Sequence, residues 1–337
     1  MLKISENYSL LNHNTFHLEA YSRYFIEYSD EDELKEALKL PIVRNNKVLH
    51  IGSGSNLLFT SDYNGVVLHS AIRGIDIIDE NHESVSIRVG AGEIWDDVVA
   101  YCVATNLYGA ENLSLIPGET GAAAVQNIGA YGVELKDIIE AVEVVDIDNG
   151  VQKVFSNADC KYAYRNSVFK TELKDKYIIS RVVLKLSKKP QLNLDYGNIK
   201  DSLPKTEEVD LSTVRQTIIS IRESKLPNPN LVGNAGSFFM NPYVTVEKYN
   251  TLKHKFPQIP CYPVSDELVK VPAAWLIEQC GWKGKSFGNA AVHDKQCLVI
   301  INKGGATASE IVELSVQIRF TVKEQFDIEL IPEVIFL

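Results

Sequence analysis

The sequence predicts an α+β protein of more than one domain, and three observations carry this prediction. The chain has 337 residues with 45% hydrophobic content, which is enough to bury more than one core. Its apolar runs alternate between the periodicity of strands and that of helices. Two stretches of small residues, at 52–59 and 117–132, each follow an apolar run and are predicted as loops that leave strands.

The N-terminal part, residues 17–70, is predicted as a small α/β unit that carries the first loop. An acidic, amphipathic run at 30–40 predicts a helix between the first two strands. The strands are predicted at 24–29, 47–51 and 65–70.

The middle of the chain is predicted as a second sheet covered by a helix. Runs at 73–79, 85–90, 141–148 and 176–187 have strand character, and 93–106 has helical character. In that helix one face collects Trp95, Val98, Val99, Cys102 and Val103, which predicts packing on the sheet.

A domain boundary is predicted near the helix at 211–225, which follows a polar segment at 189–210. The remainder alternates helix and strand, and Thr307 to Glu310 form a capping box before a helix. The chain therefore divides into predicted domains 1–70, 71–222 and 223–337.

Composition limits the class of protein. A net charge of −10 argues against a nucleic-acid partner. Five cysteines without metal spacing are expected to be reduced thiols, so no metal is predicted. No apolar stretch is long enough for a membrane span, and the N-terminus lacks a signal-peptide core, so a cytoplasmic protein without a membrane partner is expected.

The two loops predict a dinucleotide held from both sides, because glycines let backbone NH groups approach a phosphate. They do not match the Rossmann fingerprint, since Leu57 stands where its third glycine belongs. For the first loop alone, a plain tight turn remains an alternative. An anionic ligand would need local cations, and Arg165, Arg222 and Lys225 lie beside the motifs, although solvated surface positions would also explain them.

Six motifs occur in one order: GSGSNLLF, IPGETGAAAVQNIGAYGVELKD, YAYRNSVFK, SKLPNP, GNAGSFFMNP and a terminal PEV. Together they resemble the UDP-N-acetylenolpyruvoylglucosamine reductase family, from about Asn14 to the C-terminus. The resemblance implies a two-part FAD-binding module of the vanillyl-alcohol-oxidase/PCMH type, at 1–70 and 71–222. It also implies a C-terminal α+β substrate-binding domain at 223–337, whose last segment returns to the flavin.

The resemblance also implies the activity. An oxidoreductase acting on a CH–CH group would use NADPH and non-covalent FAD to reduce UDP-N-acetylglucosamine enolpyruvate to UDP-N-acetylmuramate. This reaction belongs to peptidoglycan precursor synthesis, and hence to cell-wall biogenesis, cell shape and cell division. A monomer is expected.

Three catalytic residues are carried over from the family motifs. Arg165 would grip the substrate carboxylate, although a structural ion pair would also explain it. Ser237 would donate the proton to C2, whereas a serine in a glycine-rich loop is commonly a backbone cap. Glu333 would assist as an acid, because its apolar setting favours a neutral carboxyl; an ordinary surface carboxylate is the alternative.

The remaining site residues are carried over in the same way. Tyr196 would lie on a flexible lid that marks the longer form of the family. Tyr164 would serve packing or orientation. For Tyr262 and Gln296, ordinary surface or packing positions are the alternative. The predicted flavin contacts are Gly52, Ser53, Gly54, Ser55, Asn56, Leu57, Gly118, Gly121, Ala122, Gln126, Asn127, Ile128, Gly129, Tyr131 and Arg222. The predicted substrate contacts are Tyr164, Tyr196, Lys225, Asn241, Tyr262 and Gln296.

Some positions depart from the family pattern. Met240 replaces a polar residue and Ile335 replaces an arginine, and Glu119 places an acid in the second loop. Because the approach of the backbone to a phosphate tolerates no Cβ at the tightest points, valine at Gly54 or Gly121 is expected to give a folded, colourless protein.

Two other functions remain open from the sequence. The same flavin scaffold could serve an oxidase or dehydrogenase of a hydroxylated substrate, although such enzymes often tether flavin through His or Cys and neither loop contains one. A non-catalytic nucleotide-sugar binding protein would retain only part of the motif set.

Overall fold

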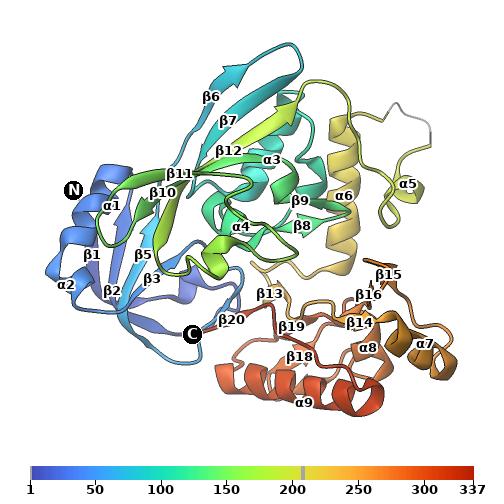
Figure 1. Cartoon of the computed structure of the whole chain (residues 1–337). Coiled ribbons are helices and arrows are strands. Elements are labelled where there is room, and N and C mark those ends of the chain that lie inside the picture. Colours follow the sequence, from blue (N-terminus) through green and yellow to red (C-terminus); the bar gives the residue numbers. More distant parts are fainter. Residues whose placement is uncertain (1, 206–208) are drawn as a thin grey trace. The chain divides into compact units, whose positions relative to one another are not determined.

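The computed structural model describes residues 2–205 and 209–337 (Figure 1). Met1 of the first predicted domain and 206–208 of the predicted polar segment lie outside the described residues. The chain forms two compact units. The first holds 1–8, 21–53 and 63–224, and the second holds 9–20, 54–62 and 225–337. The division into 1–70, 71–222 and 223–337 stays a prediction.

The first unit contains two sheets. One has the order β1-β2-β5-β3, with β2 and β3 both parallel to β5, and the other has the antiparallel order β11-β10-β12-β7-β6. The strands are β1 (Lys3–Ser9), β2 (Tyr21–Tyr28), β3 (Val48–Ile51), β5 (Tyr63–Ser70), β6 (Ile75–Glu80), β7 (Ser84–Gly90), β10 (Ile139–Asp146), β11 (Gln152–Ser156) and β12 (Tyr177–Ser187), with a short hairpin of β8 (Gly129–Ala130) and β9 (Val133–Glu134).

The helices of the first unit cover these sheets with their apolar faces. Asp30 caps the first helix by accepting from the backbone of Asp32 and Glu33. In the helix over the second sheet, Trp95, Val98, Val99 and Cys102 are buried as predicted. The helices are α1 (Glu31–Lys39), α2 (Pro41–Arg44), α3 (Trp95–Ala104), α4 (Thr120–Gln126), α5 (Ile199–Ser202) and α6 (Leu211–Lys225), with 3₁₀ turns η2 (Glu111–Leu113), η3 (Leu135–Asp137) and η4 (Val168–Lys170).

The second unit packs a long helix, α9 (Ala308–Phe326), against an antiparallel sheet of order β13-β19-β18-β17. The predicted capping box is present, since Thr307 and Glu310 each bond the other's backbone NH. The other elements are η1 (Leu11–His13), β4 (Leu57–Leu58), β13 (Gly233–Ser237), β14 (Tyr243–Thr245), α7 (Val246–Lys255), β15 (Tyr262–Pro263), β16 (Leu268–Lys270), α8 (Ala273–Gln279), β17 (Ser286–Phe287), β18 (Ala290–Val292), β19 (Val299–Asn302) and β20 (Ile335–Phe336).

Three local expectations differ from the structure. Strands β1 and β11 were not predicted, because both are mostly exposed and carry little apolar periodicity. The run Leu113–Ile116 does not form a strand: it leaves the 3₁₀ turn η2, and Leu115 is left-handed with φ of 57°. The second loop itself contains the short helix α4.

Candidate functional site

The two glycine-rich stretches meet in the first unit. A Cβ built on Gly52, at the end of β3, would lie 3.1 Å from Glu119 Oε2 and 3.2 Å from Ala122 Cβ, at the start of α4. The first loop therefore begins against the first turn of α4. This juxtaposition supports the prediction of one ligand held between the two loops.

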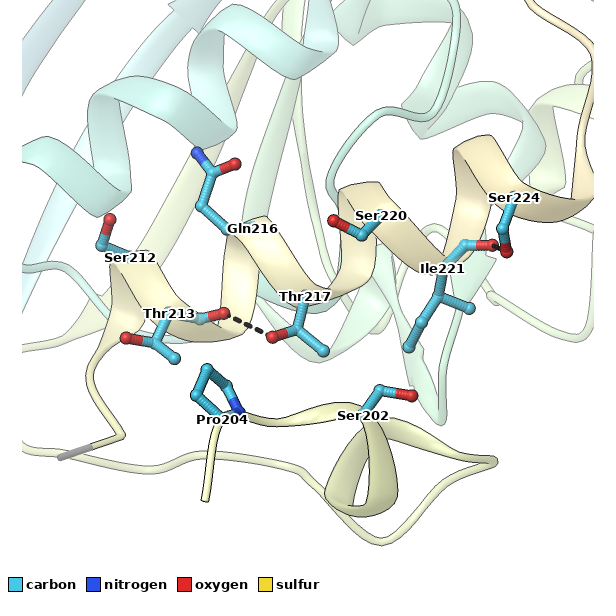
Figure 2. A pocket seen from close by; sticks show the side chains of 9 residues that line it. All are labelled: Ser202, Pro204, Ser212, Thr213, Gln216, Thr217, Ser220, Ile221 and Ser224. Carbon is cyan, nitrogen blue, oxygen red and sulfur yellow. Dashed lines mark hydrogen bonds between the residues drawn. The ribbon is translucent and has the colours of Figure 1, made fainter. Parts of the chain in front are cut away.

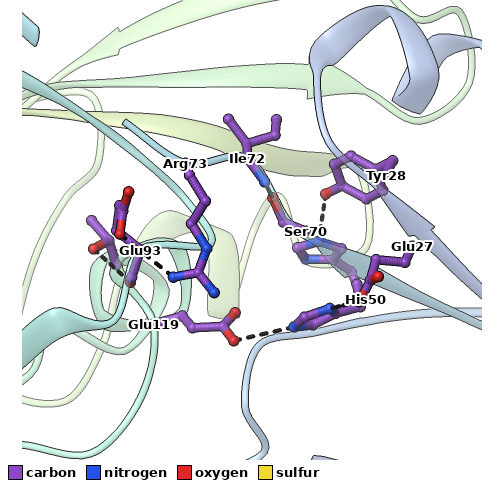
Figure 3. Close-up of polar contacts among 10 residues, drawn as sticks. Glu27, Tyr28, His50, Ser70, Ile72, Arg73, Glu93 and Glu119 are labelled. Carbon is purple, nitrogen blue, oxygen red and sulfur yellow. Dashed lines mark hydrogen bonds and ion pairs between the residues drawn. The ribbon is translucent and has the colours of Figure 1, made fainter. Parts of the chain in front are cut away.

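Glu119, the unexpected acid of the second loop, is buried among the polar side chains that Figure 3 shows. It is bonded to His69 on β5. His69 Nε2 lies 3.1 Å from Glu119 Oε1, and its Nδ1 lies 3.2 Å from Glu27 Oε2 on β2. The buried carboxyl group of Glu119 therefore has the imidazole of His69 as a hydrogen-bond partner. Sequence reasoning missed His69 because it lies 50 positions before Glu119.

The carboxylates set the protonation of this histidine. Burial by itself lowers the pKa of His69, but the hydrogen bonds and attraction from Glu119 and then Glu27 outweigh burial and raise it. On β3 the opposite holds, since burial and the nearby His69 lower the pKa of His50 to about 3. The two carboxylates therefore favour the positively charged form of His69.

The loop glycines have a structural reason that the sequence did not reveal. Gly54 has φ of 71°, and a Cβ there would lie 1.9 Å from the carbonyl oxygen of His13. A Cβ on Gly121 would lie 2.8 Å from that of Ala91. Both glycines are required by close backbone packing. Valine at either site would disturb the fold, so the expectation of a folded, colourless protein is wrong.

The residues present fit a dinucleotide with phosphates. Within the described residues, the backbone NH groups of Gly54 and Asn56 donate to no other residue, which leaves them as donors for an anion. In the first unit Nε of Arg222 is buried and has no hydrogen-bond partner in the described part of the chain. Burial lowers the pKa of Arg222, Tyr131 and Asp96 act to raise it, and the neighbouring charge of Arg165 acts to lower it. A bound anion would offset both the burial of the Arg222 charge and its repulsion by Arg165.

The C-terminal half of the second loop is held in unusual backbone conformations. Asn127 and Tyr131 are left-handed, with φ of 48° and 50°. The buried Asn127 side chain donates to Ala163 O and Glu134 Oε2 and accepts from Lys136 N. Asn127 therefore shapes the loop through its side chain, whereas Gly129 offers its carbonyl to Arg165.

Arg165 stands at the tip of a tight turn and reaches back to this loop. Its Nη2 donates to Gly129 O at 2.7 Å, and its Nη1 donates to Asn127 O at 3.5 Å. The guanidinium also lies 5.5 Å from the ring centre of Tyr164, which supports an orienting role for that tyrosine.

Tyr196 lies over the same loop. A Cβ on Gly132 would come within 3.0 Å of Tyr196 Cβ, and the tyrosine is 43% exposed. The buried Asn112 donates to the carbonyls of Tyr131 and Asn193, and so ties the start of the Tyr196 segment to the loop. Asn112 was missed because a lone asparagine in a 3₁₀ turn carries no sequence signal.

Ser237 ends β13 in the second unit, after an irregular turn. Asn234 accepts from Gly236 N at 3.0 Å, Gly236 has φ of 68°, and the pairing register with β19 shifts between Asn234 and Ser237. Among residues 2–205 and 209–337 none hydrogen-bonds the Ser237 hydroxyl. Ser237 is therefore not a backbone cap here, and its hydroxyl is left for a ligand.

Glu333 lies beside Ser237 in this unit. Glu333 N donates to Phe238 O at 2.8 Å, and Pro332 pairs with Phe239, so the C-terminal segment runs antiparallel to 238–240. On its other side the same segment meets the first loop, since Asn56 donates to Glu333 O and β20 is parallel to β4. The half-buried Glu333 is thus fixed between the first loop and the Ser237 segment.

The other predicted substrate contacts also lie in the second unit. Lys225 and Tyr262 are exposed. Asn241 Oδ1 accepts from Ala273 N and thereby holds the start of α8, which leaves its amide nitrogen for a ligand. Gln296 Oε1 accepts from Leu298 N at 3.3 Å. Their use by substrate stays a prediction.

A separate cavity of about 620 Å³ lies between α6 and the α5 segment of the first unit (Figure 2). Hydroxyl groups of α6 dominate its lining, and none of the predicted site residues takes part. The part of the chain that the structure describes holds no cluster of three His, Cys, Asp or Glu side chains suited to a metal. Within those same residues, no helix has the length and apolar character to span a bilayer.

Comparison with known sequence families gives two matches. A model described as "FAD binding domain" matches residues 22–156, and one described as "UDP-N-acetylenolpyruvoylglucosamine reductase, C-terminal domain" matches 228–337. These matches confirm the predicted α+β fold class of a flavin module followed by a C-terminal domain.

Curated relatives extend over the whole chain. It is 49% identical to the UDP-N-acetylenolpyruvoylglucosamine reductase of Bacteroides fragilis (strain YCH46), over 99% of this chain and 100% of that protein. It is 45% identical to the enzyme of the same name from Porphyromonas gingivalis (strain W83), over all of both chains. The crystal structure of the Thermus caldophilus enzyme matches 100% of this chain and 98% of its own, with a TM-score of 0.70 and 23% identity, which shows a shared fold.

Proposed function

The chain belongs to the UDP-N-acetylenolpyruvoylglucosamine reductase family, and from this premise we propose how its own residues carry out the family's reaction. The reaction is the NADPH-dependent reduction of UDP-N-acetylglucosamine enolpyruvate to UDP-N-acetylmuramate through bound FAD. FAD, when bound, supplies the transfer of hydride from NADPH to the substrate. The protein must bind the substrate carboxylate and provide a proton for the adjacent carbon.

Flavin binding is proposed for both loops. The NH groups of Gly54 and Asn56 and the guanidinium of Arg222 are donors for the cofactor's phosphates. Gly52 and Ala122 lie against each other at the start of the two loops, where a larger side chain has little room. Ser53, Ser55, Leu57, Gly118, Gly121, Gln126, Ile128 and Tyr131 complete the proposed set.

The substrate carboxylate is assigned to Arg165. A guanidinium binds a carboxylate through two parallel hydrogen bonds and keeps its charge at any physiological pH. As hydride reaches C3 of the substrate, negative charge moves onto C2 and the carboxylate, and a fixed cation stabilises that charge. Lys225, Tyr196, Tyr164, Asn241, Tyr262 and Gln296 are proposed to hold the nucleotide sugar.

Proton donation to C2 is assigned to Ser237, with Glu333 assisting. The single observation that carries this assignment is the open hydroxyl of Ser237 next to Glu333 in one pair of segments. Because Ser237 and Glu333 lie on paired segments, Ser237 can donate the proton to C2 while Glu333 hydrogen-bonds the product.

The test separates the two halves of the cycle. Ser237→Ala should be reduced by NADPH at the normal rate, because that step needs no proton on C2. Reoxidation by the enolpyruvyl sugar should slow by about 10² to 10⁴, the usual worth of a positioned general acid. Anaerobic stopped-flow absorbance of the flavin measures both rates. Ser212→Ala, on the exposed face of α6, is the matched control. Reoxidation of Ser237→Ala at the wild-type rate would remove this serine from the mechanism.

We also propose that the protein works as a monomer in the cytoplasm. Every proposed catalytic and binding residue comes from one chain, so no second copy is needed to complete the set. Light scattering on the eluting protein measures the mass, and a dimer at working concentration would contradict the monomer.

A further inference from the structure

Lys170 joins the second loop to the turn that carries Arg165. It is the last residue of η4 and is half-buried. Its Nζ lies 2.8 Å from Gln126 Oε1 and 2.8 Å from the carbonyl oxygen of Arg165. One ammonium group therefore contacts both a proposed flavin residue and the backbone of the proposed catalytic arginine.

The turn that holds Arg165 is tight and strained. Ala163 and Asn166 exchange both backbone hydrogen bonds at 3.0 Å, which leaves Tyr164 and Arg165 as the two tip residues. Arg165 has φ of 54°, a left-handed conformation that a side chain with a Cβ adopts only where its surroundings hold it. Lys170 grips the carbonyl of this strained residue, while the guanidinium is bound to Gly129 and Asn127. Arg165 is thus anchored at both ends.

The contact with Lys170 fixes which end of the Gln126 amide faces the ammonium group. An ammonium group has only donors, so it must face the amide oxygen and not the amide nitrogen. The NH₂ group of Gln126 is thereby fixed on the opposite side as a donor. Gln126 is the last residue of α4, and the left-handed Asn127 follows it, so this amide sits where the helix ends and the loop begins.

We propose that Lys170 is a positioning residue for this reaction, which holds the Arg165 backbone and the Gln126 amide in one fixed arrangement. The inference rests on the proposed role of Arg165 and goes beyond it. Without the ammonium group, the turn can relax towards an unstrained backbone and the guanidinium loses its fixed direction. The Gln126 amide can then rotate and place its oxygen at the position that its NH₂ group holds when Lys170 is present.

The experiment compares Lys170→Met, which keeps the length of the side chain, with Lys170→Arg, which keeps charge and donors. Lys170→Gln, with a donor and no charge, serves if methionine is not tolerated. Lys161→Met is the matched control, since Lys161 in the same segment pairs with Glu172 and both side chains are 61% exposed. Three quantities are measured. They are the dissociation constant for FAD and, on the FAD-loaded protein, the rates of flavin reduction by NADPH and of reoxidation by the enolpyruvyl sugar.

Hydrogen bonds from a charged group are strong, so Lys170→Met should weaken FAD binding and slow reoxidation by about tenfold or more each. Flavin reduction by NADPH should stay within about threefold, because that step does not depend on the direction of Arg165. Lys170→Arg should recover most of both losses, and Lys161→Met should behave like the wild type.

Reoxidation of Lys170→Met at the wild-type rate would overturn the inference, and so would equal damage in Lys170→Met and Lys170→Arg. Arg165→Met, measured in parallel, separates this inference from the proposed function. Wild-type reoxidation by Arg165→Met would remove the arginine from the reaction. If reoxidation is slow in Arg165→Met but normal in Lys170→Met, the role of Arg165 stands and only the positioning role of Lys170 is refuted.

Discussion

Replacing Glu119 by Gln tests the buried histidine between two carboxylates. His69 is 10% exposed and lies 3.1 Å from Glu119, whose side chain is 5% exposed. Burial lowers the pKa of His69, but Glu119 and Glu27 together raise it. The folded protein therefore binds this proton more tightly than the unfolded chain. The resulting stability is fully present below the unfolded pKa of about 6.5 and is lost as the pH rises through the higher folded value.

The structure sets the expected size of the effect. A hydrogen bond to a charged partner contributes about 1.5–3 kcal/mol, and Glu119 is buried, so little of this is screened. Glu27 is 32% exposed, and Lys3 also pairs with it, so it compensates only in part. Glu119→Gln keeps the shape of the side chain and removes its charge. It should destabilise the protein by about 2 kcal/mol at pH 6 and by less at pH 9, because deprotonation of His69 removes the charge that Glu119 attracts.

The assay is urea unfolding at constant salt, followed by circular dichroism at pH 6 and pH 9 with FAD in excess. The quantity compared is the shift in midpoint between variant and wild type at each pH. Glu172→Gln is the control, because its exposed pair with Lys161 should contribute little at either pH. An equal shift for Glu119→Gln at both pH values would refute a charged His69, and a larger shift at pH 9 would reverse the sign of the argument.

Two further substitutions test the loops. Gly54→Ala should lower the soluble yield and the melting temperature of the protein, because its Cβ would meet His13 O at 1.9 Å and φ is 71°; a stable, colourless variant would contradict this. Asn112→Ala should release the carbonyls of Tyr131 and Asn193 and raise the Michaelis constant for the UDP sugar about tenfold, while flavin reduction by NADPH stays near normal. Steady-state and stopped-flow kinetics check the second result, and an unchanged Michaelis constant would contradict it.

Local features of this protein could be predicted from sequence because their causes lie within a few residues. The capping box needs only Thr307 and Glu310, and the face of α3 needs only its helical spacing. Strands β1 and β11 escaped notice because exposed edge strands lack the apolar alternation that burial imposes.

The sequence by itself determined the fold class and singled out the two candidate flavin loops and the candidate catalytic residues, since these are written in residue type and order. Only the tertiary structure decided why Gly54 must be glycine, where Glu119 points, and that Glu333 lies beside Ser237. These depend on contacts between segments far apart in the chain: Glu333 pairs with the backbone of Phe238 and Asn56, and Glu119 with His69. Such pairings are selected by packing and by the need to satisfy buried polar groups, and neither leaves a local pattern in the sequence.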